Sequence, residues 1–424
     1  MKIKFTNARI LTMKDGENIS IGELWVEDSN ITYVGDVKDD SDIKWDKVID
    51  CEGNVLMPGF KNAHTHSGMT AFRSLADDLN LQDWLNNMIF PREAVMSGED
   101  IYWLTKLAIL EYLTTGVTLI ADMYLTPETI LDACAQMGMR CEIVSGLNKF
   151  GPTLEVLENR YNNLNGKDEL VGFKMGVHAE YTCDKELLES VSELIHKYKA
   201  PLYVHMSETK TEHQECIDRY GMTPMAFFDS LGLWDFGGSI YHGVWVDDND
   251  MEIMKKRGIS VITNPASNAK LASGIAPIAK YIEKGIVVGI GTDGPSSNNC
   301  LDMFREMFLV TALAKVKDLD PKAVPAFDVL KMACVNGASS LGHDECTTLS
   351  VGNKADIVMI DLHQPNMQPI LNITNNIVYS GSKTNVKMTM INGKILYMDG
   401  KFIGVDVDEI YAKCSEITER LKDI

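Results

Sequence analysis

The stretch Met57–His66, which reads MPGFKNAHTH, decides the fold prediction because it places two histidines at the end of an apolar run. The run Val55–Phe60 has the composition of a β-strand, and residues i and i+2 of a strand point to the same side. His64 and His66 therefore present two imidazoles on one face, where both can bind one metal ion. Such a pair is weak evidence by itself, because isolated histidines are more often structural.

The middle of the chain strengthens this interpretation because His205, His242 and Asp293 each follow a strand-like apolar run. Strand-like and helix-like segments alternate there with a regular period, which is typical of an α/β fold. Eight such units are the number found in a (β/α)8 barrel of the TIM type. The expected strands are Val55–Phe60, Val117–Met123, Arg140–Leu147, Gly172–His178, Pro201–His205, Ser239–Val246, Ser260–Thr263 and Ile286–Gly291.

A doubly wound open sheet is the alternative fold. It would carry a Gly-rich phosphate loop after its first strand, but the sequence has His64-Thr65-His66 at that place. We therefore predict an α/β protein with a TIM-like barrel.

Short alternating β runs with turn signals occur at both chain ends and predict a small β-sandwich built from both of them. The expected boundaries are 1–56 and 346–424 for the sandwich, with a terminal helix around Val407–Leu421, and 57–345 for the barrel.

Composition limits the classes of protein to which the chain can belong. Its 424 residues are 45% hydrophobic and 24% charged, as in a soluble globular protein with an ample core. The formal net charge of −20 argues against a nucleic-acid partner, which requires a basic surface. No apolar run approaches the length of a membrane span, and the N-terminus lacks the features of a signal peptide. Nine cysteines without a CxxC pair indicate reduced thiols and a cytoplasmic location.

In a barrel of this type, the active site forms at the carboxyl ends of the strands. The polar residues expected there are His64, His66, His178, His205, Glu208, His242 and Asp293. Three imidazoles and one carboxylate among them form a ligand set that suits Zn²⁺, or alternatively Fe²⁺ or Mn²⁺. A metal held this way lowers the pKa of a bound water toward neutrality. The expected ligands are His64, His66, His205 and Asp293, and Asp293 can also take the water's proton.

Glu208 lies three residues after His205 and has two interpretations. It can be a first-turn helix carboxylate favoured by the helix dipole, or a proton shuttle to a ring nitrogen of the substrate. Beside the metal set we favour the shuttle, with His242 orienting the attacking water. Lys174 lies on the fourth strand, about 13 Å below the rim at about 3.3 Å per residue, too deep to bridge two metals. A single divalent ion is therefore expected.

Read together, these residues resemble the amidohydrolase superfamily. More narrowly, the chain is similar to the 5'-methylthioadenosine/S-adenosylhomocysteine deaminases and their chlorohydrolase-like relatives. The similarity extends over nearly the whole chain, including both β ends. The matching stretches are Pro58–His66, Trp84 with Ile89–Glu93, Gly176–His178, His205–Glu208, His242–Val244, Asn264–Asn268 and Gly291–Asn299.

The resemblance implies a metal-dependent hydrolytic deaminase that acts on a 6-aminopurine nucleoside and releases ammonia. It implies the same four metal ligands, and proton transfer by Glu208 and His242. It also implies that Glu93 holds the ribose hydroxyls and that His178 contacts the bound nucleoside. The plainer alternative for Glu93 is a solvated carboxylate that opens the following helix.

The sequence departs from the family pattern at two places. Ser145 and Thr153 stand where better-known members carry two arginines that can hold a homocysteine carboxylate. Lys149 is nearby, but an ammonium group cannot form a bidentate fork. We therefore favour 5'-methylthioadenosine or adenosine over S-adenosylhomocysteine as the substrate. Glu180 replaces an expected proline after His178, which can alter the edge that binds the base.

Two other functions are weighed against this one. The first is hydrolysis of another amino- or chloro-substituted heterocycle, such as guanine, a pterin, cytosine or a triazine. The second is a non-catalytic scaffold, although such a protein would be expected to have lost metal ligands. The zinc deaminases with an H-x-E and CxxC signature are excluded because the chain has no CxxC. The expected partner is a small molecule, and neither nucleic acid nor a membrane is expected. The oligomeric state stays open between a monomer and a homo-oligomer.

Overall fold

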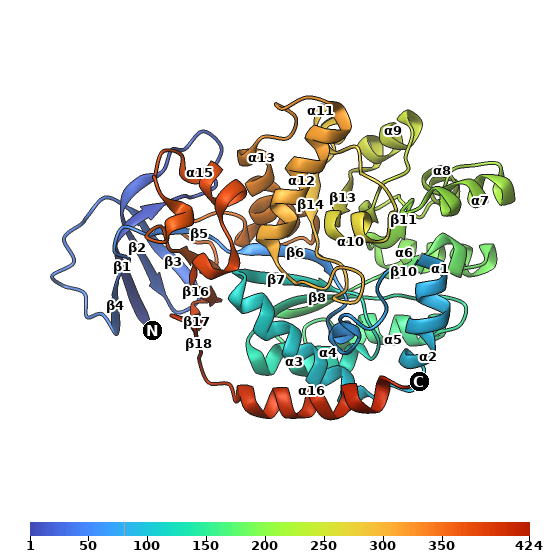
Figure 1. The fold of residues 1–424 in the computed structure, drawn as a ribbon, viewed down its shortest axis with the longest axis horizontal. Coiled ribbons are helices and arrows are strands. Elements are labelled where there is room, and N and C mark those ends of the chain that lie inside the picture. The colour runs from blue at the N-terminus through green and yellow to red at the C-terminus, as the bar shows by residue number, and fades with distance from the viewer. Residues whose placement is uncertain (80) are drawn as a thin grey trace.

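The structure, a computed structural model, describes residues 1–79 and 81–424 and shows a closed barrel of parallel strands (Figure 1). Two hydrogen-bonded arcs form the barrel, in the orders β6-β7-β8-β9 and β10-β11-β12-β13-β14. Bridges between Thr65 and Asp293 and between Leu147 and Val177 join the arcs on both sides. The strands are β6 (Phe60–Thr65), β7 (Val117–Asp122), β8 (Arg140–Val144), β9 (Val171–Lys174), β10 (Gly176–Ala179), β11 (Leu202–Met206), β12 (Gly238–His242), β13 (Ile259–Thr263) and β14 (Val288–Ile290).

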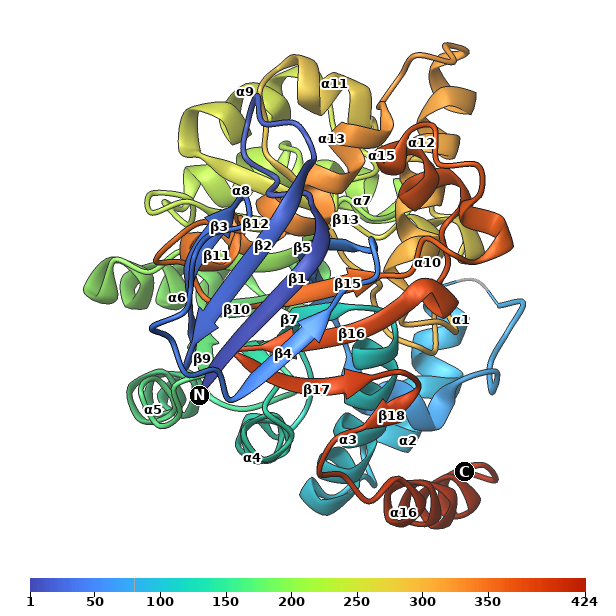
Figure 2. The ribbon, with the colours of Figure 1, turned by 90° about the vertical axis from the view of Figure 1, so that its left-hand side faces the viewer.

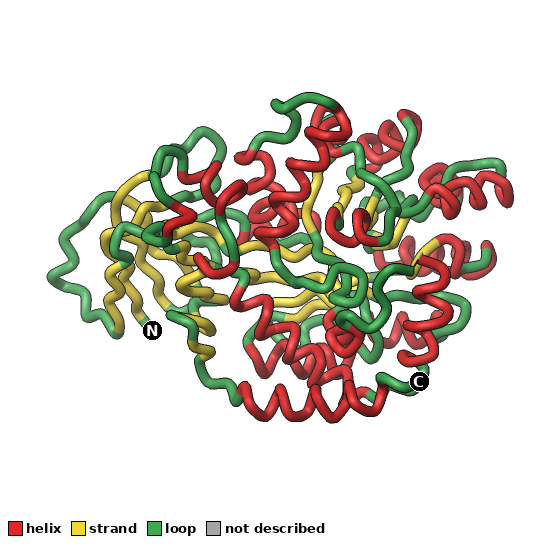
Figure 3. Tube along the Cα trace, viewed as in Figure 1, coloured by secondary structure: helices red, strands yellow, loops and turns green. Residues whose placement is uncertain are grey.

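Helices cover the outside of the barrel, which explains why its strands read as continuous apolar runs (Figure 3). Every residue of β7 and of β13 is buried. Helix α6 shows how sequence sets the outer layer. Asp184 caps its first turn by accepting the Leu187 N–H at 2.9 Å, and its buried residues recur at helical spacing. The larger outer helices are α3 (Gly98–Thr114), α4 (Pro127–Met137), α5 (Leu154–Leu164), α6 (Lys185–Tyr198), α9 (Asp248–Arg257) and α12 (Met303–Asp318).

A nine-stranded sheet lies at one end of the barrel and draws on both ends of the chain (Figure 2). Its order is β18-β17-β16-β15-β5-β1-β2-β3, with β4 paired to β1. Side chains such as Phe5, Leu24 and Met388 form a separate apolar core within it. The predicted α/β class with a TIM-like barrel and a β-domain from both ends is confirmed. The strands are β1 (Lys2–Ile10), β2 (Ser20–Glu27), β3 (Asn30–Gly35), β4 (Lys47–Asp50), β5 (Val55–Pro58), β15 (Ile357–Ile360), β16 (Val386–Ile391), β17 (Lys394–Met398) and β18 (Lys401–Phe402).

The apolar run that we expected to form the first barrel strand is divided between two sheets. Its first part, β5, pairs with β1 and β15 in the terminal sheet, and the barrel strand β6 begins only at Phe60. The chain crosses at Gly59, where a Cβ atom would overlap the side chain of Thr118. Both sheets bury this run, so its apolar pattern could not show the division. The domain boundaries 1–56, 57–345 and 346–424 stay a prediction.

The expected terminal helix is present as α16 (Val407–Leu421), which packs on α3 through the buried Ile410, Cys414 and Ile417. An ion pair of 2.6 Å between Arg420 and Asp100 joins the same two helices. Among the helices of residues 1–79 and 81–424, none has both the length and the apolar character needed to cross a bilayer. The remaining helices are α1 (Leu81–Asp83), α2 (Phe90–Glu93), α7 (Lys210–Tyr220), α8 (Pro224–Ser230), α10 (Pro265–Lys270), α11 (Ile278–Glu283), α13 (Ala326–Lys331), α14 (Gly337–Ser340) and α15 (Ile373–Asn375).

Candidate metal and substrate site

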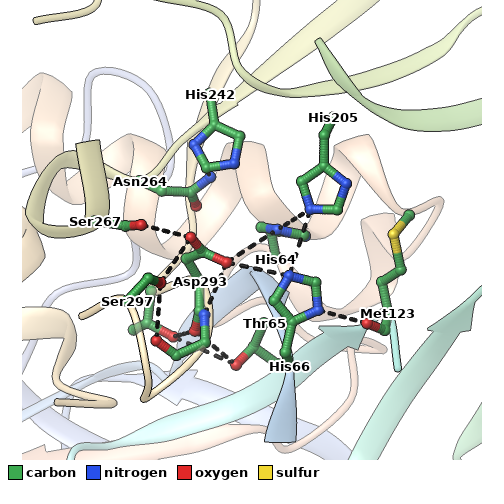
Figure 4. Close-up of polar contacts among 12 residues, drawn as sticks. His64, Thr65, His66, Met123, His205, His242, Asn264, Ser267, Asp293 and Ser297 are labelled. Atoms are coloured by element: carbon green, nitrogen blue, oxygen red, sulfur yellow. Dashed lines mark hydrogen bonds and ion pairs between the residues drawn. The ribbon is translucent and has the colours of Figure 1, made fainter. Parts of the chain in front are cut away.

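The structure brings the predicted metal ligands together at the carboxyl ends of the barrel strands (Figure 4). His64 lies in β6 with His66 just beyond it, His205 lies in β11, and Asp293 follows β14. His242, the last residue of β12, joins the same group. Asp293 and His242 have φ angles of 60° and 72°. Positive φ is uncommon for residues with a side chain and occurs where the surroundings hold a functional group in place.

The distances between ligand atoms match a tetrahedral cation. His205 Nε2 lies 3.1 Å from His64 Nε2 and 3.4 Å from His66 Nε2. Asp293 Oδ1 lies 3.1 Å from His66 Nε2 and 3.5 Å from His64 Nε2. A tetrahedral ion with bonds of about 2.0–2.1 Å sets its ligand atoms about 3.3–3.4 Å apart. The four side chains therefore fit one divalent ion.

Hydrogen bonds behind the imidazoles direct their lone pairs inward. His66 Nδ1 lies 2.5 Å from the Met123 carbonyl oxygen, and His205 Nδ1 lies 2.7 Å from the carbonyl of His178. A carbonyl only accepts, so each Nδ1 carries the hydrogen and each Nε2 presents a lone pair. Burial lowers the pKa of His64 to about 3 and that of His205 well below its usual range. A neutral imidazole nitrogen with a free lone pair can bind a metal ion, so these pKa directions fit the proposed ligand role of His64 and His205.

The carboxylate of Asp293 is held on its far side by two serines. Ser267 Oγ and Ser297 Oγ donate to Oδ2 at 2.5 and 3.0 Å, and the Gly294 N–H donates to Oδ1 at 2.8 Å. Burial raises the pKa of Asp293, but the imidazoles of His64 and His66 beside Oδ1 outweigh it, and the net pKa is well below the usual range. The serines lie in two stretches that carried the family resemblance, yet sequence reasoning did not single them out.

His242 and Glu208 form a polar pair beside the predicted ligands. Asn268 Oδ1 lies 2.8 Å from His242 Nδ1, and Glu208 Oε2 lies 3.7 Å from His242 Nε2. Because an amide oxygen only accepts, Nδ1 carries the hydrogen and the lone pair of Nε2 points into the site. Ser273 Oγ donates to Glu208 Oε1 at 3.2 Å. Burial raises the pKa of Glu208, so this carboxyl group can hold and release a proton.

Glu212, which sequence reasoning did not select, fixes the loop that carries Glu208. Its carboxylate accepts the N–H groups of Ser207 and Glu208, both at 2.8 Å. Burial and the neighbouring charge of Glu208 raise the pKa of Glu212 to about 7. The signal was available, because Thr209 and Glu212 form a capping box at the start of α7.

A cavity of about 400 Å³ opens beside this cluster. Glu93 and His178 line it, together with apolar side chains such as Trp84, Leu85 and Phe90. This mixture of an apolar wall and a few converging polar groups is typical of small-molecule sites. Burial raises the pKa of Glu93, which is hydrogen-bonded to Tyr124, and burial lowers the pKa of His178 to about 4.

The two residues at the positions of the family's arginines, Ser145 and Thr153, lie in different surroundings. Ser145 lines the cavity, whereas Thr153 caps α5 and accepts the Val156 N–H at 3.4 Å. Lys149 lies over the ring of Phe150 at 5.0 Å. Glu180 is buried in an ion pair of 2.5 Å with Arg219. Among the described residues that line the cavity, Thr153, Lys149 and Glu180 do not occur.

The barrel, its accessory sheet and the histidine–aspartate cluster define the class of protein. The model of the amidohydrolase family matches residues 55–396, and the chain belongs to that family. The residues at the site accordingly form a candidate divalent-metal centre within an amidohydrolase fold.

Two named relatives are similar over the full chain. The 5-methylthioadenosine/S-adenosylhomocysteine deaminase of Desulforamulus reducens is 38% identical, with 99% of each chain covered. The 5'-deoxyadenosine deaminase of Methanobrevibacter smithii is 39% identical and covers 99% of this chain and 98% of its own. Among solved structures, an adenosine deaminase from Xanthomonas campestris with bound zinc superposes with a TM-score of 0.93 at 28% identity, covering 100% of this chain and 99% of its own.

Proposed function

We propose that this protein is a metal-dependent hydrolytic deaminase of a 6-aminopurine nucleoside that releases ammonia. The observation that carries the proposal is the convergence of His64, His66, His205 and Asp293 beside Glu208 and His242 at one cavity. The deaminase names of full-length relatives and of the zinc-bound structural neighbour support the same reaction.

His64, His66, His205 and Asp293 would hold one divalent ion, with Zn²⁺ favoured over Fe²⁺ or Mn²⁺ because three nitrogens and one oxygen suit it. Such an ion, when bound, lowers the pKa of water and so supplies the nucleophile of a hydrolysis at neutral pH. The serine hydroxyls on Asp293 Oδ2 orient that carboxylate, as the carbonyls behind His66 and His205 orient their rings.

The remaining polar groups would move protons. Glu208, whose pKa is raised by burial, protonates the purine ring nitrogen next to the amine-bearing carbon. His242 accepts a hydrogen bond from the attacking water through Nε2, and the ionised Asp293 accepts the proton that this water loses. A carbon–oxygen bond forms at C6, the proton held by Asp293 passes to the amino group, and the carbon–nitrogen bond breaks to release ammonia. The hydrogen of the new C6 hydroxyl returns to Glu208, which leaves a keto product protonated at the ring nitrogen.

The cavity supports a nucleoside rather than a bare base. Glu93 and Tyr124 would offer a hydrogen-bonded carboxylate and hydroxyl to the ribose, and His178, which lines the same cavity, would contact the nucleoside. With Ser145 and no arginine at that wall position, 5'-methylthioadenosine, adenosine or a 5'-deoxy nucleoside is favoured over S-adenosylhomocysteine.

Purified, zinc-loaded protein tests the proposal through ammonia release and the ultraviolet shift that accompanies deamination of adenine. The panel contains adenosine, 5'-methylthioadenosine, 5'-deoxyadenosine and S-adenosylhomocysteine, with guanine, a pterin, cytosine and a triazine as alternatives. Glu93→Gln should weaken turnover of nucleosides strongly and of bare bases hardly at all. Turnover confined to a bare heterocycle would contradict the nucleoside assignment, and no turnover with full metal loading would contradict the deaminase.

The cysteines and the net charge of the chain bear on the proposed location and partner. All nine cysteines are free thiols, and eight of them are buried, which supports a reducing, cytoplasmic location. The net charge of −20 supports a small molecule, and not nucleic acid, as the partner. Sedimentation of the purified protein will establish whether it forms a homo-oligomer.

A further inference from the structure

One wall of the cavity lies beside barrel strands that carry none of the candidate metal ligands. It is built by the loops after β7 and β8 and by α5. Among the described residues that line the cavity, Arg160 on α5 is the only lysine or arginine. The wall residues nearest to it in sequence are Leu147, Asn148, Gly151 and Pro152, which are uncharged.

Arg160 is already engaged by a partner outside the cavity. Its Nε and Nη2 donate to the two carboxylate oxygens of Glu128 on α4, at 2.8 and 3.1 Å. Glu128 itself is not among the described residues that line the cavity. Burial raises the pKa of Glu128, but Arg160 outweighs it and the net pKa is lowered. Both members of this bidentate pair are therefore charged, and together they are formally neutral.

This pair changes what the wall can recognise. In the proposed pose, a nucleoside that presents C6 to the histidine cluster would extend its 5' substituent toward this wall. A carboxylate there would meet an Arg160 guanidinium that is already paired with Glu128, and the negative charge of Glu128 offsets part of the attraction. It would also lose hydration without gaining a full partner. A neutral 5' group has no such loss.

We propose that Glu128 is a specificity-determining residue that withholds the Arg160 guanidinium from a carboxylate on the 5' substituent. The protein therefore selects nucleosides with a neutral 5' group. This inference rests on the proposed deaminase function and adds to it a residue that controls the substrate class.

The test compares kcat/KM for three thioethers of adenosine. These are 5'-methylthioadenosine, which is neutral, S-adenosylhomocysteine, which is a zwitterion, and 5'-S-(2-carboxyethyl)-5'-thioadenosine, which is an anion without an ammonium group. Glu128→Gln keeps the shape of the side chain and removes its charge. The double variant Glu128→Gln/Arg160→Gln removes the guanidinium as well. Asp229→Asn is the matched control, because it disrupts a pair of 2.6 Å with Arg257 outside the cavity lining.

We expect Glu128→Gln to raise kcat/KM for both carboxylates, relative to 5'-methylthioadenosine, by about tenfold. This is the lower end of the range for a charge-assisted hydrogen bond, because the Glu128 and Arg160 side chains are 47% and 22% exposed. The gain should be larger for the anion than for the zwitterion and should disappear in the double variant. Asp229→Asn should leave the ratio unchanged, and thermal melting of each variant verifies folding.

Two outcomes overturn the inference. If the ratio does not change in Glu128→Gln while 5'-methylthioadenosine is still deaminated, Glu128 does not control access to Arg160. If the wild type prefers S-adenosylhomocysteine and Glu128→Gln loses that preference, Glu128 attracts the substrate's ammonium group instead. Absence of turnover with every adenosine derivative in the wild type would overturn the proposed function, and this inference with it.

Discussion

Replacing Asn268 by alanine tests whether the orientation of His242 supports catalysis. Asn268 Oδ1 accepts the Nδ1 hydrogen of His242 at 2.8 Å, and both side chains are buried. Asn264 Nδ2 lies 3.4 Å from the same Nδ1. Without Asn268, the Asn264 amide can donate to Nδ1, which moves the ring hydrogen to Nε2. The lone pair that faces Glu208 and the attacking water would then be lost.

The size of the effect follows from one buried hydrogen bond. Without the Nε2 lone pair, the attacking water loses its acceptor in a buried site, and an unpaired buried donor costs about 1–3 kcal/mol. If that loss is expressed in the transition state, and about 1.4 kcal/mol is tenfold in rate, kcat/KM falls about 5- to 150-fold. KM should change little, because Asn268 is not among the described residues that line the cavity.

The assay measures kcat, KM, bound metal and the pH profile for Asn268→Ala and for Asn268→Asp. The aspartate keeps an acceptor at the same place, so its kcat should stay within about tenfold of the wild type. Its negative charge would face the His242 ring, so the pH profile of kcat should differ from that of the wild type. Metal content should be equal in all three proteins, because among the described residues the side-chain hydrogen bond of Asn268 goes to His242 and not to a proposed ligand.

A different result would refute the reasoning. If Asn268→Ala retains the wild-type kcat and pH profile but melts at a lower temperature, Asn268 serves packing alone and His242 needs no fixed tautomer. If Asn268→Ala loses bound metal, the residue acts through the ligands and not through His242.

Three further predictions concern stability. Arg140→Met should lower the free energy of unfolding by about 3–5 kcal/mol, because it leaves Asp356 buried without the partner that now lies 2.8 Å away. Urea unfolding measures this loss. The double variant Arg140→Met/Asp356→Asn should recover part of it. Burial lowers the pKa of His343, but Glu142 and Glu345 at 2.6 and 2.9 Å outweigh it and the net pKa is raised above 6.5. The stabilisation from His343 should therefore be complete below about pH 6 and disappear as the pH rises through the folded-state pKa. Unfolding curves of the wild type and His343→Gln, measured across this pH range, test the prediction. A difference in unfolding free energy that does not change with pH would contradict it. Removal of metal by a chelator should lower the melting temperature and abolish deamination, and added Zn²⁺ should restore both; an unchanged melting temperature would contradict a metal bound to the folded state.

Much of the architecture could be predicted because it depends on local pattern. Alternating strand-like and helix-like segments are typical of a barrel, and a barrel collects the carboxyl ends of its strands at one rim. His64, His205 and His242 each stand at such an end, so their meeting followed from topology alone. The prediction of Val55–Phe60 as a single barrel strand was wrong, because an apolar run buried in either sheet has the same composition.

Other parts of the site depend on residues whose partners lie far away in the chain. Ser267 on α10 reaches Asp293 across 26 residues, and Asn268 on the same helix reaches His242 across 26 residues. No spacing rule connects such residues, because the distance between loops is set by how the barrel closes. The pairing of Glu128 with Arg160 is of the same kind, since it depends on how α4 packs beside α5.

The amino-acid sequence by itself determined the class of fold, the rim on which the chemistry gathers and the identity of the side chains that can bind a metal. Periodicity and side-chain chemistry are local properties, and they are enough for these conclusions. Only the tertiary structure decided which hydroxyls and amides orient those side chains and which charge stands beside the cavity wall. Hydrogen bonds and ion pairs form over about 3 Å, so they depend on positions that the packing of the whole chain establishes.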